Sequence, residues 1–214
     1  MTPTMPVPTQ VAHFTHLDHL PSIVNNGILA DTHVQVSGHL TVEVGNQGIK
    51  GARRGRAVTV APYGVVADYV PFYFAPRSPM MFAIHRGNVP TYQGGCEDLV
   101  YLVSTVQRLS EEGLTIVLTD RNASLAVTRF SADVAQLPEL VDWPLMSAHF
   151  WGNTREDPAR KERRMAECLV HGAVPWRAIV GIGAYDQARA DRVVSMLGEV
   201  GAAAQVDVRR HWYF

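Results

Sequence analysis

The sequence predicts a single α+β domain built on a mixed, strongly bent β-sheet. Strand-like apolar runs outnumber the helical segments, and they interleave with short helices without the regular alternation of a parallel sheet. A chain of 214 residues, 47% of them hydrophobic, is long enough to bury one large core. We expect residues 11–214 to form this domain. Residues 1–10, with three prolines in the first eight positions, are expected to be a flexible N-terminus.

Eight segments have the composition of β-strands, because they are rich in the β-branched and aromatic residues that suit a pleated surface. We expect strands at residues 11–15, 57–60, 69–74, 99–104, 114–119, 167–170, 179–182 and 204–208. The run from Tyr69 to Phe74 is the densest aromatic stretch of the chain. Its Pro71 cannot donate a ladder hydrogen bond, which predicts an edge or bulged position for this strand.

Short helices are expected between these strands. We place them at residues 18–26, 105–112, 131–137 and 186–199, with one more that carries Met80 to Ile84. Asp18 fits an N-cap, and Gly27 can take the left-handed conformation that ends a helix. Residues 155–165 are strongly charged and are expected to be an exposed helix or a mobile loop.

Residues 31–64 are polar, contain several glycines and show weak periodicity. They form either one long functional loop or loops around one short helix, since long loops inside compact domains are usually functional or mobile. Arg53 and Arg54 lie before the aromatic strand, and Arg77 follows it. Arginines in such positions are either solvated surface charges or groups that stack on bases and contact phosphates.

Charge and cysteine content exclude several classes of protein. The formal net charge is −1, so any DNA contact must come from a local basic patch. No apolar run approaches the ~18 residues of a membrane span, and no segment resembles a signal peptide, so we expect a cytoplasmic protein without membrane contact. Cys96 and Cys168 have no metal-binding spacing and are expected to be free thiols.

Histidines recur at three-residue spacing in His13, His16 and His19. A predicted strand end and helix start separate them, so we expect ordinary histidines rather than metal ligands. The chain has no nucleophile elbow and no P-loop. Gly181-Ile182-Gly183 lacks the third glycine of a dinucleotide fingerprint.

Glu167 is an acidic residue at the start of an apolar strand, directly after the basic segment 160–164. A carboxylate in this position needs either a partner or solvent. It is therefore either a strand-end acid paired with a nearby arginine or a functional carboxylate.

Four blocks of residues carry a resemblance to a known family. They are His13-Phe14-Thr15-His16-Leu17-Asp18-His19-Leu20-Pro21-Ser22-Ile23-Val24 with Gly27, Ile49-Lys50 with Arg53-Arg54 and Val58, Asp68-Tyr69-Val70-Pro71-Phe72-Tyr73-Phe74 with Arg77-Ser78-Pro79-Met80, and Arg164-Met165-Ala166-Glu167-Cys168-Leu169-Val170 with Pro175-Trp176. Their order resembles the DarT family, bacterial toxins that ADP-ribosylate bases in single-stranded DNA with NAD. The third block is the most specific. A weaker block runs from Thr119 to Ala123, and the match covers residues 11 to about 180.

The resemblance implies an ADP-ribosyltransferase fold, with a split, mixed β-sheet core flanked by short helices and NAD in the cleft as co-substrate, without a metal. It implies that Glu167 is the catalytic glutamate and Arg53 the catalytic arginine, with Arg54 as the alternative. The residues assigned to NAD are His13, Thr15, Gly27, Arg54, Tyr69, Phe72 and Tyr73. Strand alternation lets only one face of the aromatic strand look into the site, so not all of its rings can be contacts.

The residues assigned to DNA are Arg54, Arg77, Arg121, Asn122 and Arg164. The chain departs from the usual family pattern at three positions. These departures are His19 in place of Asn, Arg121 in place of Gly, and Cys168 in place of Phe. His19 therefore bears on the details of NAD contact, and Arg121 on base preference.

The implied reaction transfers ADP-ribose from NAD to a base in single-stranded DNA, with thymidine as the expected acceptor and with sequence specificity. Alternatives are a guanosine acceptor, a transferase of the same fold that acts on RNA or protein, and a non-catalytic nucleic-acid-binding module. The presence of His13, Thr15, Arg53 and Glu167 argues against the last of these. The resemblance also implies a toxin–antitoxin system, with a macrodomain antitoxin as partner and a role in phage defence.

Overall fold

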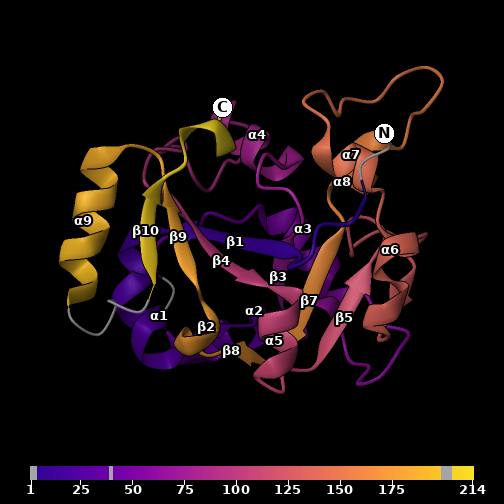
Figure 1. Ribbon diagram of the computed structural model, residues 1–214, viewed down its shortest axis with the longest axis horizontal. Helices are drawn as coiled ribbons and strands as arrows, with labels where there is room; N and C mark the ends of the chain where they lie inside the picture. Colours follow the sequence, from indigo (N-terminus) through magenta and orange to yellow (C-terminus); the bar gives the residue numbers. More distant parts are fainter. Residues whose placement is uncertain (1–3, 39–40, 199–203) are drawn as a thin grey trace.

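The computed structural model describes residues 4–38, 41–198 and 204–214, in which helices surround a central sheet (Figure 1). The strands are β1 (Gln10–His16), β2 (Ile28–Leu29), β3 (Tyr69–Tyr73), β4 (Leu99–Thr105), β5 (Ile116–Thr119), β6 (Phe130–Ser131), β7 (Glu167–His171), β8 (Ala173–Val174), β9 (Gly181–Ala184) and β10 (Gln205–Val208). The α-helices are α1 (Leu20–Asn26), α2 (Asp31–Ser37), α3 (Gln47–Gly55), α4 (Pro79–His85), α5 (Val106–Glu111), α6 (Leu137–Leu140), α7 (Trp143–Ser147), α8 (Arg160–Arg164) and α9 (Gln187–Leu197).

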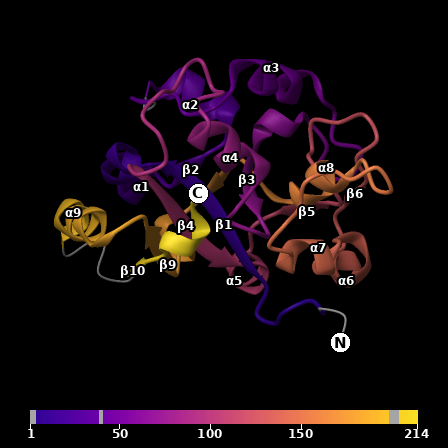
Figure 2. The same cartoon turned by 90° about the horizontal axis from the view of Figure 1, so that it is seen from above.

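Within the described residues, eight strands form one mixed sheet in the order β10-β9-β4-β1-β3-β7-β5-β6, and β2 pairs with β8 in a small second sheet. β9 and β10 are parallel, while the other neighbours in the large sheet are antiparallel. Helix α9 lies beside β10 at one end of the molecule, and α6 and α7 lie at the other end (Figures 1 and 2). The predicted α+β class with a mixed sheet is confirmed.

The large sheet is split between β1 and β3. β1 pairs with β4 over all seven of its residues, and β3 pairs with β7 over all five, but β1 and β3 share only the pair Ala12 and Tyr73. The carbonyl oxygen of Pro71 points toward β1, where His13 Nδ1 donates to it at 2.8 Å. A strand residue directs its N and its C=O to the same side, so the missing N–H of Pro71 also faces β1. β3 lies between β1 and β7 in the sheet, but its side toward β1 is almost unpaired, so the edge position that Pro71 predicted is found only locally, along the split.

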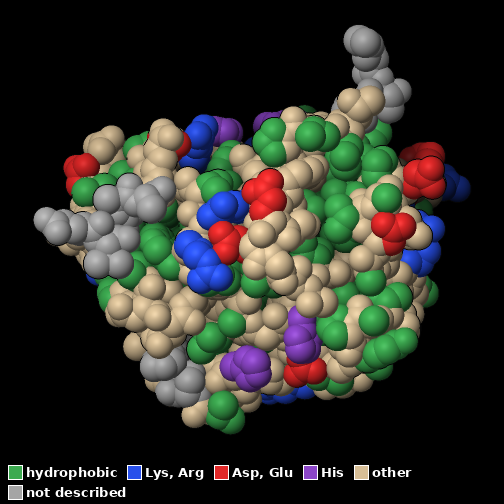
Figure 3. Space-filling view, turned by 60° about the horizontal axis from the view of Figure 1, so that its bottom comes forward, with side chains coloured by type: hydrophobic (Ala, Val, Ile, Leu, Met, Phe, Trp, Pro, Cys, Tyr) green, Lys and Arg blue, Asp and Glu red, His purple; other side chains and the backbone are tan. Residues whose placement is uncertain are grey.

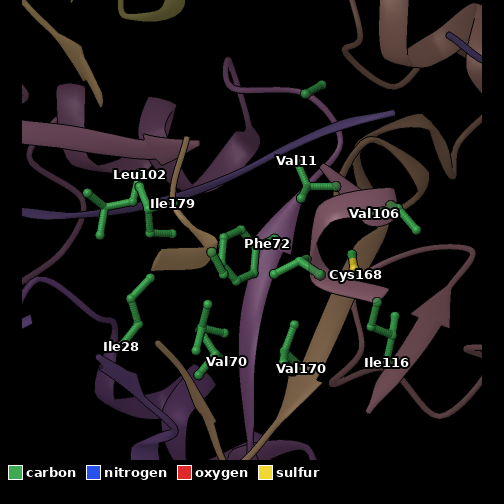
Figure 4. Close-up of a cluster of buried hydrophobic side chains, with 14 of the residues drawn as sticks. Val11, Ile28, Val70, Phe72, Leu102, Val106, Ile116, Cys168, Val170 and Ile179 are labelled. Carbon is green, nitrogen blue, oxygen red and sulfur yellow. The ribbon is translucent and has the colours of Figure 1, made fainter. Parts of the chain in front are cut away.

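One face of the sheet carries the main hydrophobic core (Figure 4). Phe72 lies at its centre, fully buried, with Val70, Leu102 and Val170 around it. Apolar residues of α1, α5, α6, α7 and α9 complete this core. Burial of apolar area of this kind is the main favourable term in folding, so this face fixes the position of both halves of the sheet.

The opposite face carries two smaller cores, one on each half of the sheet. The first joins Ala12 and Tyr101, on β1 and β4, to Met81 of α4. The second joins Tyr69 and Leu169, on β3 and β7, to neighbouring apolar residues. The boundary between these two cores falls on the split, which leaves space there for a site.

Most of the predicted strands and helices are confirmed within one or two residues of their ends. The strand predicted at residues 57–60 is wrong, because this segment makes only an isolated bridge between Ala57 and Val65. Tyr63 and Gly64 take positive φ angles of 69° and 82°, and the chain turns back there instead of extending. The described part of residues 31–64 contains two helices, α2 and α3, rather than one long loop or one short helix.

Two helix boundaries also differ from prediction. Asp18 is not the N-cap of α1, because a 3₁₀ turn at Leu17–His19 precedes that helix, and the His16 side chain caps this turn by accepting from the Asp18 N–H. The helix expected at residues 131–137 begins later, as a 3₁₀ turn at Val134–Gln136 followed by α6. Glu199, the predicted end of α9, lies outside the described residues.

The N-terminal segment is held closer to the domain than predicted. Gln10 already belongs to β1, and Thr9 is fully buried with its N–H donated to Gln107 Oε1 at 2.8 Å. Residues 1–3 of the expected flexible segment lie outside the described residues. Cys96 and Cys168 are buried free thiols, as predicted.

The surface shows no simple charge asymmetry on the face turned forward in Figure 3, where acidic and basic side chains lie next to each other near the centre. Among the described helices, none combines the length and the apolar character that crossing a bilayer requires.

Substitution of Phe72 tests the central role of the main core. Phe72→Ala is expected to lower the free energy of unfolding by about 3–5 kcal/mol, because it leaves a cavity in a fully buried position. Phe150 is 83% exposed, so Phe150→Ala should change stability by less than about 0.5 kcal/mol. Urea unfolding of both variants measures these changes in stability, and equal midpoints would contradict the central role of Phe72 in the core.

Candidate active site

A cavity of about 250 Å³ lies over the split in the sheet. Its walls come from β1, from β3 and from the segment of residues 43–53, which includes most of α3. The predicted site residues that line it are His13, Thr15, Gly27, Arg53, Tyr69 and Tyr73. The fold therefore brings together predicted site residues that are up to 60 positions apart in the chain.

Glu167 is the first residue of β7 and pairs with Tyr73 of β3 in the sheet. Its side chain is 1% exposed. The carboxylate accepts from Arg53 Nη1 at 3.1 Å and 2.9 Å, one distance to each oxygen, and from the Ala123 N–H at 3.0 Å. A buried carboxylate is costly unless it is paired in this way. Arg53 and Glu167 therefore form one electrostatic unit.

Arg53 separates Glu167 from the cavity, since Arg53 lines the cavity and Glu167 does not. Its Nη2 is buried and has no hydrogen-bond partner among the described residues, so this donor of the guanidinium remains open. Arg54 points elsewhere and donates to Asp31 through Nε at 3.1 Å and Nη2 at 3.0 Å. The geometry thus distinguishes two arginines that are adjacent in sequence, and only Arg53 contacts Glu167.

Backbone and hydroxyl groups hold Glu167 in place from behind. Thr119, at the end of β5, accepts the Glu167 N–H on its Oγ1 at 2.9 Å and donates to the Arg121 carbonyl at 2.7 Å. These bonds bring the turn after β5 over Glu167, so that the Ala123 N–H reaches the carboxylate. Sequence reasoning missed Ala123 because it acts through its backbone, which no side-chain pattern reveals.

His13 is held as a neutral imidazole. Its Nδ1 lies 2.8 Å from the Pro71 carbonyl, which can only accept, so Nδ1 carries the proton. Burial lowers the pKa of His13 from 6.5 to about 4, against the hydrogen bond to Pro71, which raises it. At neutral pH, Nε2 therefore presents a bare lone pair, and it has no partner among the described residues.

Thr15 and His19 form a relay that ends on the wall of the cavity. His19 Nε2 accepts from the Val42 N–H at 3.1 Å, and burial lowers the pKa of this imidazole, so Nδ1 carries the proton and donates to Thr15 Oγ1 at 2.8 Å. The Thr15 hydroxyl can then donate to a ligand. The unusual His19 thus ties β1 to the segment around Val42, a role that its sequence position alone did not indicate.

The three aromatic residues of β3 have different roles. Tyr73 lines the cavity, stacks on Phe14 with centroids 6.3 Å apart, and has a pKa raised by burial and by Glu167, so it stays a protonated donor. Tyr69 also lines it, but its hydroxyl donates to the Tyr63 carbonyl at 2.6 Å. Phe72 lies on the opposite face in the main core, and its ring packs 5.8 Å from that of His13. Its predicted contact with NAD is therefore replaced by a supporting role.

Gly27 and Lys50 shape the base and the wall of the cavity. Gly27 has a φ of 77°, and a Cβ there would lie 2.5 Å from the Val174 carbonyl oxygen, so no other residue fits without strain. Lys50 bridges Asp31 at 2.7 Å and Glu43 at 2.6 Å. This ion-pair group joins α2, the segment before α3 and α3 itself into one wall.

The residues assigned to DNA are not brought together in the cavity. Arg121 pairs with Asp120 at 3.2 Å, and Asn122 accepts from the Ser124 N–H and hydroxyl at 2.9 Å and 2.8 Å, so both help to shape the turn over Glu167. Arg77 and Arg164 lie outside the cavity, at a second hollow. Arg164 is 4% exposed, so this part of the segment 155–165, which was expected to be an exposed helix or a mobile loop, is buried.

The histidines near the cavity do not form a metal site. His13 and His19 make separate hydrogen bonds to Pro71 and to Thr15. Across the parts of the chain that the structure covers, no group of three or more His, Cys, Asp or Glu side chains could hold a metal ion.

Comparison with known proteins gives a consistent result. Residues 12–214 match the family model described as "ssDNA thymidine ADP-ribosyltransferase, DarT". A DNA ADP-ribosyl transferase of Thermus sp. (strain 2.9) is 36% identical over 216 residues and is covered completely, as is this chain. The structure of Thermus sp. 2.9 DarT with ADP-ribosylated ssDNA matches with a TM-score of 0.92 over 100% of both chains, at 36% identity.

Two further matches bear on the ligand and on a partner. The structure of Thermus sp. 2.9 DarT with NAD+ matches with a TM-score of 0.87, at 36% identity, over 99% of this chain and 100% of that chain. A fusion of a DNA ADP-ribosyl transferase and a DNA ADP-ribosyl glycohydrolase from Thermosipho africanus is 25% identical over 81% of this chain and 42% of the fusion.

The lowered pKa of His13 predicts a specific pH dependence. Because the unfolded chain binds this proton near pH 6.5 and the folded chain only near pH 4, stability is lost as the pH falls through that interval. The loss due to His13 should reach about 3 kcal/mol. NMR titration should place the midpoint of the His13 imidazole near 4. His13→Asn identifies the signal, and a midpoint near 6.5 would refute the neutral, buried state.

Proposed function

This chain belongs to the DarT family of ssDNA thymidine ADP-ribosyltransferases, and we propose that it transfers ADP-ribose from NAD to thymidine at the cavity over its split sheet. It is an NAD-dependent DNA ADP-ribosyltransferase, with NAD as co-substrate and single-stranded DNA as acceptor. The observation that carries the proposed location is the buried pair of Glu167 and Arg53 at the wall of a cavity with several open polar groups.

The open polar groups suit a ligand with hydroxyl and amide groups. The Thr15 hydroxyl and the unpartnered Arg53 Nη2 offer donors, while the neutral His13 offers an acceptor at Nε2. The rings of Phe14 and Tyr73 give an apolar surface beside them. This combination of a mostly apolar lining and a few directed polar groups is typical of small-molecule sites. We assign the nicotinamide-side part of NAD to this cavity.

Glu167 is proposed as the catalytic carboxylate. The reaction breaks the bond between the ribose carbon and nicotinamide and forms a bond from that carbon to a ring nitrogen of the base. Positive charge develops on the ribose, and a negative group fixed nearby stabilises it without reorganisation. Glu167 also provides a base for the proton that leaves the acceptor nitrogen, an effect that typically contributes ~10²–10⁴-fold.

This role requires a rearrangement of Arg53. Glu167 is 1% exposed and stands behind the Arg53 guanidinium, so the carboxylate meets a substrate only after the guanidinium shifts. The unpartnered Nη2 of Arg53 already points to an incomplete set of hydrogen bonds in this arrangement. We propose that Arg53 exchanges its bonds to Glu167 for bonds to the bound substrates, where its positive charge stabilises the deprotonated base or a phosphate.

A partner that reverses the modification fits the same proposal. The Thermosipho africanus fusion joins a DNA ADP-ribosyl transferase to a DNA ADP-ribosyl glycohydrolase in one protein. We propose that this chain is the toxin of a toxin–antitoxin pair in the cytoplasm. Its antitoxin would be a separate glycohydrolase of the macrodomain type, and a role in phage defence stays a prediction.

Glu167→Gln tests the proposed function directly. Incubation of the wild-type protein with NAD and a thymidine-containing oligonucleotide should add the mass of one ADP-ribose to the DNA. Glu167→Gln should reduce the rate by ~10²-fold or more, because the amide carries no charge and accepts no proton. Glu139→Gln, at an exposed position, should retain full activity. Parallel pools of guanosine-containing DNA, RNA and protein identify the acceptor, and a mass shift on one of these alone would overturn the thymidine assignment.

The adjacent arginines provide a matched pair of variants. Arg53→Lys should lose most activity, since a lysine cannot reproduce the planar donors that face Glu167 and the cavity. Arg54→Lys keeps a cation near Asp31 and should leave the rate within about twofold of the wild type. Turnover assays at saturating NAD compare the two, and equal losses would refute the assignment of Arg53.

A further inference from the structure

A second hollow of about 810 Å³ is strongly basic. Its lining comes from the end of the segment after β3, from the end of α7 and the residues that follow it, from α8 and from residues 208–214. The arginines and histidines that line it are Arg77, Arg164, Arg210, His149 and His211. No Asp or Glu occurs among the described residues of this lining.

Arg77 has unmet hydrogen-bonding capacity. It makes no hydrogen bond or ion pair with a described residue, and its Nε is buried without a partner. Its guanidinium lies over the Phe214 ring, 4.4 Å from the centroid. A guanidinium fixed by stacking, with all its donors unpaired, is prepared for a ligand that accepts hydrogen bonds.

Arg164 adds a second buried cation beside Arg77. Its Nη1 donates to the carbonyls of Leu145, Met146 and Ala148 at 2.6, 2.8 and 3.2 Å, but its Nε is buried and unpartnered. No carboxylate pairs with it among the described residues, and burial together with Arg77 lowers its pKa to about 10. Two cations held close together without a counter-ion repel each other, so an anion bound between them would be stabilised.

We propose that this basic hollow binds a backbone phosphate of the single-stranded DNA, next to the nucleotide that is modified. Arg164 lies three residues before Glu167, and Arg77 lies four residues after Tyr73. Each residue spans at most ~3.6 Å, so these Cα pairs are no more than ~11 Å and ~14 Å apart. A strand whose base reaches Glu167 therefore passes close to the hollow. The forked guanidinium groups match phosphate oxygens.

This inference rests on the proposed function, because it takes the DNA strand as the ligand. A phosphate contact and a base contact determine different properties of DNA binding. Phosphate contacts set the affinity and the register of a strand and carry no sequence information directly. The basic hollow should therefore contribute equally to the binding of every oligonucleotide sequence, while the choice of thymidine is made at the cavity.

The test uses Arg77→Gln, because Arg77 has no bond within the fold to lose, and Arg177→Gln as control. Arg177 is exposed and pairs with Glu112 on another part of the surface. Fluorescence anisotropy measures binding of labelled oligonucleotides to the intact proteins without NAD, over a range of salt. Arg77→Gln should weaken binding about tenfold for all sequences and reduce the salt slope by ~0.7, the value for one phosphate on a single strand. Arg177→Gln should match the wild type.

The outcomes separate this inference from the proposed function. Equal affinity and equal salt slope in Arg77→Gln and wild type would overturn the phosphate site, even if the wild type modifies DNA. Weaker NAD binding in Arg77→Gln by calorimetry would reassign the hollow to the NAD diphosphate and also overturn it. Inorganic phosphate that binds the wild type but not Arg77→Gln, and that does not displace DNA, would also overturn the proposed contact with the DNA backbone. DNA binding is measured without turnover, so failure of the modification assay does not mimic any of these results.

Discussion

The site depends on the point at which β1 and β3 stop pairing. Both strands have complete ladders on their outer sides, with β4 and with β7, but they share only the pair Ala12 and Tyr73. Pro71 has no N–H to offer toward β1, and its carbonyl is taken by a side chain, His13, instead of by a strand. Because the His13 side chain takes the place of a strand as the partner of Pro71, the sheet stays open at this point. The same bond fixes the His13 ring at the edge of the opening.

The electrostatics of the opening follow from its position between two small cores. Apolar packing on either side removes water from Glu167, and a carboxylate without water needs donors from the protein. Arg53 and the Ala123 N–H supply them. The same dry surroundings keep His13 neutral, and His19 uses its own neutral form to join Thr15 to Val42. His13 and His19 are thus neutral, each with its proton on Nδ1, before any ligand binds.

Much of this arrangement was predictable because strong local signals marked it. Aromatic and β-branched runs located β1, β3, β4 and β7, and Pro71 indicated that one side of β3 lacks a full ladder. Glu167 and Arg53 were identified through family resemblance, and only the fold showed that Arg53, and not Arg54, contacts the carboxylate. Helical periodicity in the sequence could not distinguish Arg53 from Arg54. Neighbouring side chains on α3 point about 100° apart, and which of them faces the protein depends on packing with distant parts of the chain.

Other features had no signal in the sequence. Ala123 contributes a backbone N–H, which every residue has, and its contact depends on a turn held by Thr119 and Asn122. The strand predicted at residues 57–60 failed because β-branched composition cannot foresee the reversal at Tyr63 and Gly64. Arg77 and Arg164 carry the right charge for DNA, but their location in a hollow of their own emerges only from the fold, which brings α7, α8 and residues 208–214 to the lining of one hollow.

The split has a consequence for the order of events during synthesis of the chain. One half of the sheet needs β1 and β4, and the other needs β3 and β7, so the two halves are interleaved along the sequence. Non-local pairings of this kind form late, because long loops must close first. The chain can assemble the β1–β4 half once residue 105 has emerged from the ribosome, but Glu167 joins only with β7, which ends at His171. A nascent chain shorter than this has residues that line the cavity but lacks Glu167, so the buried pair of Arg53 and Glu167 forms only after β7 has emerged.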